Sequence, residues 1–211
     1  KRDIRLQGIA LLPVHDVPAA VTELRRAVKE LGMRGAVLPG ATVLGKAYGH
    51  ADFDPLWAEA ERLDVALAVH GAPSKGFGFD FFDSFIKTHT LEHPFAILIQ
   101  LTSMIFDGVF ERFPKLRVAF LEAGCGWVPY MMDRMDEEFE RRGARWAPAL
   151  KRKPSEVMKS GNFYVSCEVE ERTLPYVIEF LGEDNVFFAS DYPHERRRAE
   201  FLKDIPEFVE R

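Results

Sequence analysis

Few features of the sequence mark a specialised class of protein. It contains two cysteines, far apart and without Cys-x-x-Cys spacing, so we expect no disulfide framework and a reducing compartment such as the cytoplasm. The longest apolar runs are too short to span a bilayer, and no signal peptide is visible. The net charge of −5 argues against nucleic acid as the main partner. These absences leave an ordinary globular protein.

The composition, with 47% hydrophobic and 29% charged residues, is enough for one sizeable core. We therefore predict a single domain over residues 1–211, although the length also allows two small ones. A pattern recurs in which a short apolar run precedes a turn and an amphipathic helix. The predicted strands are Leu6 to Leu12, Gly35 to Pro39, Val65 to Val69, Arg117 to Glu122, Asn162 to Cys167 and Val186 to Ser190.

The segments between these runs have the spacing of helices. Asp16 is a candidate N-cap for the first of them, and Pro18 falls in its first turn. Apolar residues from Val21 to Leu31 then recur at helical spacing. The further predicted helices are Phe53 to Leu63, Pro94 to Phe113, Val128 to Arg142 and Thr173 to Leu181.

Alternating strands and helices predict an α/β fold with a parallel sheet and right-handed crossovers. A closed (β/α)8 TIM barrel needs eight strands, and six are recognisable here. We therefore expect a barrel that lacks its amino-terminal β/α portion in this chain, which opens with Lys1 and not with Met. A doubly wound open sheet is the alternative, but no Gly-x-Gly-x-x-Gly turn follows the first strand.

Residues 71–93 form a long insertion that is rich in glycine and phenylalanine. Connections of this length are usually lids, binding loops or disordered, and the aromatic content argues against disorder. We predict a lid or insertion loop, with Phe79 among the candidate substrate contacts.

Three polar residues end apolar runs, where a parallel barrel assembles its chemistry. His70 and Asp191 are candidate metal ligands, and Glu122 is a candidate ligand or general base. Each has a structural alternative. His70 could be a core histidine, Asp191 a turn or N-cap residue, and Glu122 one partner of a salt bridge.

Trp127, Glu168 and His194 lie close to strand ends in the sequence, whereas His89 and His93 lie in the predicted long loop. Candidate substrate contacts are His194, His89, His93 and Trp127, and Glu168 is a weaker candidate for the site. Cys125 lies in a glycine turn with no basic neighbour in sequence, which favours a structural role over a nucleophilic one.

The chain resembles the amidohydrolase-related family that includes aminocarboxymuconate-semialdehyde decarboxylase and the resorcylate decarboxylases. The resemblance extends from Leu6-Gln7-Gly8 to Asp191-Tyr192-Pro193-His194. Its most specific stretches are residues 106–116, 129–136 and 190–193.

The resemblance implies a distorted (β/α)8 barrel with one divalent metal ion, commonly zinc. His70 matches the family's metal-binding histidine, and Asp191 matches its metal-binding aspartate. The family's first-strand ligands have no counterpart in the chain, and Ala123 stands at or next to the position of the decarboxylases' catalytic histidine.

We therefore expect a metal-dependent hydrolase or carboxy-lyase acting on a small carboxylated or cyclic substrate. Asp191 and Glu122 are the predicted catalytic residues. We expect no nucleic-acid or membrane partner and keep a homodimer open. The alternative is a non-catalytic barrel remnant or interaction domain without a complete metal site.

Overall fold

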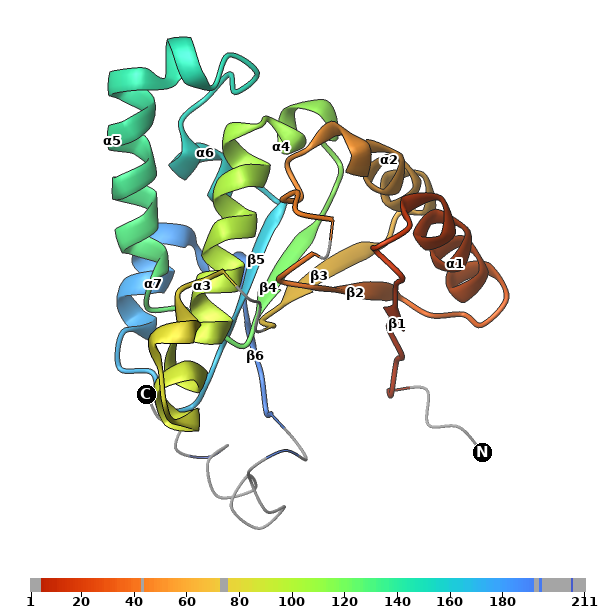
Figure 1. The fold of residues 1–211 in the computed structure, drawn as a ribbon, viewed down its shortest axis with the longest axis horizontal. Helices are drawn as coiled ribbons and strands as arrows, with labels where there is room; N and C mark the ends of the chain where they lie inside the picture. The colour runs from red at the N-terminus through yellow and green to blue at the C-terminus, as the bar shows by residue number, and fades with distance from the viewer. Residues whose placement is uncertain (1–4, 43, 73–75, 192–193, 195–205, 207–211) are drawn as a thin grey trace.

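The computed structural model describes residues 5–42, 44–72, 76–191, 194 and 206. Its centre is one sheet of parallel strands that pair in the order of the sequence (Figure 1). The strands are β1 (Ala10–Leu11), β2 (Gly35–Pro39), β3 (Ala66–His70), β4 (Val118–Leu121), β5 (Phe163–Cys167) and β6 (Val186–Phe188). The parallel sheet confirms the predicted α/β class.

Sequential pairing distinguishes between the two predicted arrangements of the sheet. Each strand is hydrogen-bonded to the next one along the chain; Val37, for example, lies opposite Ala68. A doubly wound sheet reverses its strand order at a switch point, whereas a barrel does not. Within the described residues β1 pairs only with β2 and β6 only with β5, so both strands are edges of the sheet.

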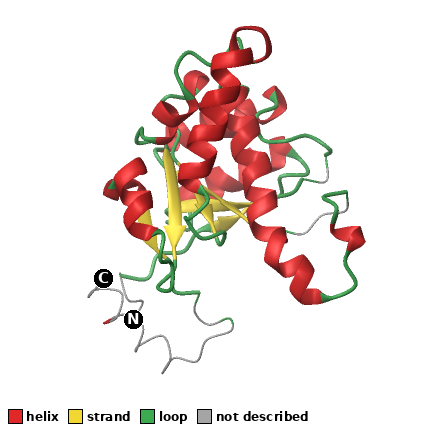
Figure 2. Ribbon diagram, turned by 90° about the vertical axis from the view of Figure 1, so that its left-hand side faces the viewer, coloured by secondary structure: helices red, strands yellow, loops and turns green. Residues whose placement is uncertain are grey.

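The helices lie along one face of this sheet (Figures 1 and 2). They are α1 (Val17–Lys29), α2 (Asp54–Leu63), α3 (Phe85–Phe106), α4 (Val109–Arg112), α5 (Val128–Trp146), α6 (Pro154–Met158) and α7 (Leu174–Leu181). Short 3-10 turns occupy Ala51–Phe53, Phe79–Phe81 and Glu183–Asn185. Among the described residues no helix is both long and apolar enough to cross a membrane.

Local sequence signals explain how the first helix begins. Asp16 has an extended backbone, and its Oδ1 accepts a hydrogen bond of 2.9 Å from the Ala19 N–H. This satisfies one of the donors that every helix start leaves free. Ala20 and Leu24 then turn inward and are fully buried. The predicted cap is confirmed. Of the predicted apolar stripe, Leu24 is buried, Val21 and Val28 are partly buried, and Leu31 lies exposed beyond the end of the helix.

The middle of the chain differs from the prediction. We expected a loop through residue 93 and a helix from Pro94, but α3 begins at Phe85 and has Pro94 in its interior. Proline favours the first turn of a helix, which misplaced the expected start. The helix that was predicted to extend to Phe113 ends at Phe106 instead. Gly108, which has a positive φ of 71°, separates α3 from α4. The short helix α6 was missed altogether.

The core fills the space between the sheet and its helices. Its largest fully buried side chains include Trp57, Tyr48, Phe110, Phe120 and Phe163. Phe120 on β4 packs against Phe163 on β5, with ring centroids 5.4 Å apart. These contacts hold the neighbouring strands together and fix where their carboxyl ends lie.

Candidate functional site

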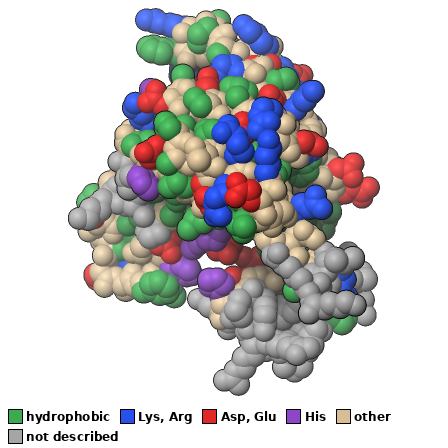
Figure 3. All heavy atoms as spheres, turned by 90° about the vertical axis from the view of Figure 1, so that its right-hand side faces the viewer, with side chains coloured by type: hydrophobic (Ala, Val, Ile, Leu, Met, Phe, Trp, Pro, Cys, Tyr) green, Lys and Arg blue, Asp and Glu red, His purple; other side chains and the backbone are tan. Residues whose placement is uncertain are grey.

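One cavity lies at the carboxyl ends of β3, β4 and β6. It has a volume of about 540 Å³. It is lined by His70, His89, Thr90, His93, Pro94, Glu122, Ala123, Gly124, Glu168, Asp191 and His194. Figure 3 shows histidine side chains gathered beside acidic ones around a recess. His70, Glu122 and Asp191, which end or follow three of the predicted strands, all line this cavity.

His70 and Glu122 face each other across two neighbouring strands. Their side chains approach to 2.8 Å, from His70 Nε2 to Glu122 Oε2. His70 Nδ1 lies 2.8 Å from the Gly71 carbonyl oxygen, which can only accept, so Nδ1 is the protonated nitrogen. In a neutral ring Nε2 then carries a lone pair. A nitrogen lone pair and a carboxylate oxygen so close together need a cation or a proton between them.

His93 reaches the same carboxylate from α3. Its Nε2 lies 3.4 Å from Glu122 Oε2. The approach depends on Gly71, because a Cβ at that position would lie only 2.4 Å from the His93 ring. Burial lowers the pKa of His93, with the carboxylates of Glu122 and Glu92 acting in the opposite direction. Burial therefore disfavours the charged form of His93.

The backbone is strained at two of the predicted site residues. Glu122 has φ of 59° and Asp191 has φ of 51°, in the left-handed region that favours glycine. The Glu122 N–H donates to Ser166 Oγ at 3.2 Å. Strain of this kind persists only where surrounding contacts hold it, and it clusters at functional sites.

Glu171 holds the turn that follows Glu122, and the sequence analysis did not identify it. Its Oε2 accepts hydrogen bonds from the N–H groups of Cys125 at 2.7 Å and Gly126 at 3.1 Å. Its Oε1 accepts from the Glu168 N–H at 2.9 Å. Because Glu171 lies in an acidic stretch, no pattern in the sequence distinguishes it from its neighbours.

Cys125 is also bound to Glu171, with its Sγ 3.1 Å from Oε2. The side chain is buried, and burial, followed by the Glu171 carboxylate, raises the pKa of the thiol. A thiol with a raised pKa is a poor nucleophile. The geometry agrees with the structural role predicted for Cys125.

The remaining predicted residues divide into two groups. His89, His194 and Glu168 line the cavity together with His93. Phe79 and Trp127 do not. Phe79 stacks on Phe95, and the Trp127 indole N–H donates to the Gly124 carbonyl at 2.8 Å. Trp127 therefore closes the turn after β4.

The structure describes only part of the predicted lid, residues 71–93. Residues 73–75 lie outside the described part of the chain. None of Phe77, Phe79, Phe81 and Phe82 lines the cavity, and Phe81 is 90% exposed. In this structure the aromatic residues thus make no lid contact with the site, and the second half of the predicted loop is the first part of α3.

Two groups of side chains in the cavity could hold a metal ion. One consists of His70, His93 and Glu122, and the other of Glu122, Asp191 and His194. The ligand atoms within each group lie within 4.8 Å of one another. Imidazole and carboxylate donors suit divalent ions such as zinc and manganese. The residues present therefore fit a divalent metal.

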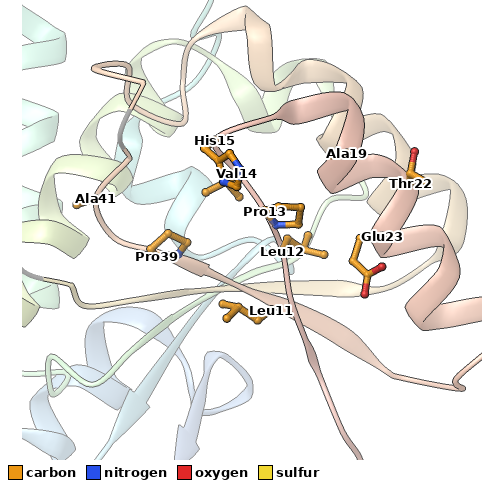
Figure 4. A pocket seen from close by; sticks show the side chains of 10 residues that line it. All are labelled: Leu11, Leu12, Pro13, Val14, His15, Ala19, Thr22, Glu23, Pro39 and Ala41. Carbon is orange, nitrogen blue, oxygen red and sulfur yellow. The ribbon is translucent and has the colours of Figure 1, made fainter.

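A second cavity of about 910 Å³ lies beyond the carboxyl ends of β1 and β2 (Figure 4). Its walls are mainly apolar and include Leu11, Leu12, Val14 and Pro39. His15 is its only histidine, and among the described residues no metal-binding group includes it. The polar groups that could do chemistry are gathered at the other cavity.

The geometry agrees with a comparison against known families, in which residues 1–208 match the Amidohydrolase family. The chain belongs to the amidohydrolase family. The resemblance read from the sequence is thereby confirmed.

Two curated relatives show which members of the amidohydrolase family are similar. The chain is 30% identical over 210 residues to 2-amino-3-carboxymuconate-6-semialdehyde decarboxylase of Dictyostelium discoideum, covering 98% of the chain and 57% of the relative. It is 31% identical over 207 residues to gamma-resorcylate decarboxylase of Rhodococcus jostii, covering 92% of the chain and 62% of the relative. The chain thus spans about three fifths of the relatives' length.

Solved structures agree on the amidohydrolase-type fold. The 5-carboxyvanillate decarboxylase of Sphingomonas paucimobilis superimposes with a TM-score of 0.79 at 28% identity, covering 95% of this chain and 60% of that one. A dihydroxybenzoic acid decarboxylase of Polaromonas has a TM-score of 0.74 at 22% identity, covering 97% and 69%. The latter contains bound manganese and the inhibitor 2-nitroresorcinol.

Proposed function

We propose that the protein is a metal-dependent carboxy-lyase acting on a small aromatic or cyclic carboxylate. The observation that carries the proposal is the convergence of His70, Glu122 and Asp191 on one cavity at the strand carboxyl ends. The decarboxylases among the relatives favour loss of a carboxyl group over hydrolysis. The volume of about 540 Å³ suits a substrate of this size.

His70 and Asp191 would hold the ion, as the resemblance to the family implies. When bound, a divalent ion polarises a substrate oxygen or lowers the pKa of bound water. Two protein ligands are fewer than the three usual at a catalytic zinc, so we propose that the complete barrel supplies more from strands beyond this chain. The bound manganese of the Polaromonas enzyme makes manganese an alternative to zinc.

Decarboxylation replaces a carboxylate by a proton, so the site must supply one. Ala123 cannot, although it lines the cavity where the resemblance implies a catalytic histidine. We propose that Glu122 takes this role. Its side chain is 30% exposed, so it can be reprotonated from solvent.

The first test is metal content together with carbon dioxide release by the full-length protein. We expect one divalent ion per chain at the site of His70 and Asp191, and release of carbon dioxide from a hydroxylated benzoate or a related carboxylate. His70→Ala and Asp191→Ala should each lose this ion and lose turnover. Unchanged metal in both variants would rule out the ligand assignment.

The Glu122→Gln variant distinguishes between the two possible roles of Glu122, proton transfer and metal binding. If Glu122 only transfers protons, this variant should keep its metal and lose about 10²–10⁴-fold in turnover. Loss of metal in Glu122→Gln would make the residue a ligand. A full-length protein with neither metal nor turnover would favour the non-catalytic alternative.

A further inference from the structure

We propose that His89, Glu92 and His93 on α3 form a second divalent-metal site, distinct from that of His70 and Asp191. Their His-x-x-Glu-His spacing puts all three on one face of the helix. Their ligand atoms lie within 4.8 Å of one another. The same spacing on a helix is used by one class of zinc enzymes. Because a loop was expected through residue 93, this helical spacing was not predicted.

The contacts within the cluster centre on one oxygen. His89 Nδ1 lies 2.8 Å from Glu92 Oε1, and His93 Nδ1 lies 3.7 Å from the same atom. Two imidazole nitrogens and a carboxylate oxygen on adjacent helix positions make a facial set of three donors. Such mixed nitrogen and oxygen sets suit zinc and its divalent neighbours.

Burial makes a cation at this cluster favourable. The Glu92 side chain is only 11% exposed. Within the described residues its ion pairs go to His89 and His93 alone, and none goes to lysine or arginine. A buried carboxylate is costly without a positive partner. A divalent ion would supply the missing charge.

The cluster is also open to ions and solvent. The His89 side chain is 42% exposed, and both histidines line the cavity that contains His70. Pro94 has no N–H for the Thr90 carbonyl, so the helical turn at the cluster lacks one of its usual internal hydrogen bonds. Thr90 lines the same cavity.

His93 links the proposed site to Glu122. While its Nδ1 faces Glu92, its Nε2 lies 3.4 Å from Glu122 Oε2. A metal-bound histidine commonly donates its other ring N–H to a carboxylate, which fixes the ring and strengthens the ligand. Glu122 is placed to accept that bond. An ion on the α3 cluster would therefore fix His93 at the edge of the first site.

The test measures zinc binding with the first site removed. In the full-length His70→Ala/Asp191→Ala variant, competition with a chromophoric chelator should still detect one bound zinc ion. Adding His89→Ala should abolish this binding, and adding Glu92→Gln should weaken it by about tenfold or more. Adding His15→Ala, an exposed histidine at the other cavity, should change nothing.

Two results would overturn the second site. One is the absence of zinc binding in His70→Ala/Asp191→Ala while circular dichroism shows it folded. The other is equal zinc affinity after His89→Ala and after His15→Ala. Cobalt absorption of the otherwise unaltered protein gives an independent measurement, and a spectrum unchanged by His89→Ala would also contradict the proposal. None of these readouts depends on turnover, so the carboxy-lyase proposal stands or fails separately.

Discussion

Two residues at the strand ends, Glu122 and Asp191, have a strained backbone conformation that directs their side chains into the cavity. Glu122 and Asp191 both have φ in the left-handed region, and their side chains line the cavity. For residues with a Cβ this conformation costs about 1–2 kcal/mol. A turn with no functional demand would favour glycine here. Asp64 has the same conformation as the C-cap of α2 and lies outside the cavity, so the strain argues for function only together with the convergence of the Glu122 and Asp191 side chains.

Two variants of Glu122 measure this strain. Glu122→Ala and Glu122→Gly both remove the carboxylate, but only glycine relieves the left-handed backbone. We expect Glu122→Gly to exceed Glu122→Ala in free energy of unfolding by about 1 kcal/mol in urea titrations. Both should be inactive. Equal stability of the two variants, or a more stable alanine variant, would contradict the account of strain.

The sequence indicated some residues of the site and not others, for physical reasons. His70, Glu122 and Asp191 are recognisable because each follows an apolar run, and polar residues there are conspicuous. Glu171 is not, because it accepts N–H groups from a distant turn that the linear order does not place beside it. Glu92 lies between two histidines that are close in sequence, but their spacing brings them together only on a helix, and a loop was expected there.

At the scale of elements, the turn after β4 depends on an acceptor from the segment after β5. Replacing Glu171 by glutamine turns one of its acceptor oxygens into a donor that faces backbone N–H groups. We expect Glu171→Gln to lower the free energy of unfolding by about 1–3 kcal/mol and to reduce turnover, because Glu122 begins this turn. Urea denaturation and steady-state kinetics measure the two effects.

The control for Glu171→Gln is Glu179→Gln, which alters an exposed glutamate on the nearby helix α7. It should leave both quantities unchanged. A Glu171→Gln protein as stable and active as Glu179→Gln would show that the turn after β4 holds its shape without this carboxylate.

The pairing of α1 with α2 should depend on pH. Glu59 on α2 accepts hydrogen bonds from Arg62 at 2.8 Å and Arg25 at 2.9 Å. The hydrogen bond from Arg62, opposed by burial and assisted by Arg25, lowers the pKa of Glu59 to about 2. A lowered carboxyl pKa stabilises the fold above the unfolded value of about 4.5 and loses that effect as pH falls toward 2.

Glu59→Gln should therefore be less stable than the parent at neutral pH, by about 1–2 kcal/mol, and the difference should shrink between pH 4.5 and 2. Urea titrations across that range measure it. Glu183→Gln, at an exposed position, should follow the parent at every pH. A difference between Glu59→Gln and the parent that does not change with pH would contradict the assignment.

Elements were predictable where local signals and tertiary packing agree. The N-cap at Asp16 and the periodic stripe of α1 specify that helix without help from the rest of the fold. At α3 the two disagree. Its start lies in a phenylalanine-rich stretch with no side-chain cap. Pro94 suggests a boundary but lies in the helix interior, next to His93, which packs on Gly71.

For the molecule as a whole, the alternation of strands and helices predicted that the strands are parallel. It did not predict which strands lie at the edges of the sheet, because strand neighbours are determined by contacts between residues far apart in the sequence. β1 pairs only with β2 within the described residues, and Leu11 on it is 74% exposed. Leu6 and Ile9 before it are also exposed. An apolar sheet edge of this kind is a template for pairing with another chain.

In the complete barrel proposed above a further strand would cover this edge, so we expect self-association through β1 of the 211-residue chain alone and not of the full-length protein. Sedimentation velocity should show an average mass that rises with concentration. Leu11→Lys should shift the protein toward monomer, because a charge on an edge strand opposes pairing with a second copy. Leu31→Lys changes an exposed leucine outside the sheet and should associate like the parent. A parent that stays monomeric at every concentration, or a Leu11→Lys variant that associates as Leu31→Lys does, would show that this edge is protected in another way.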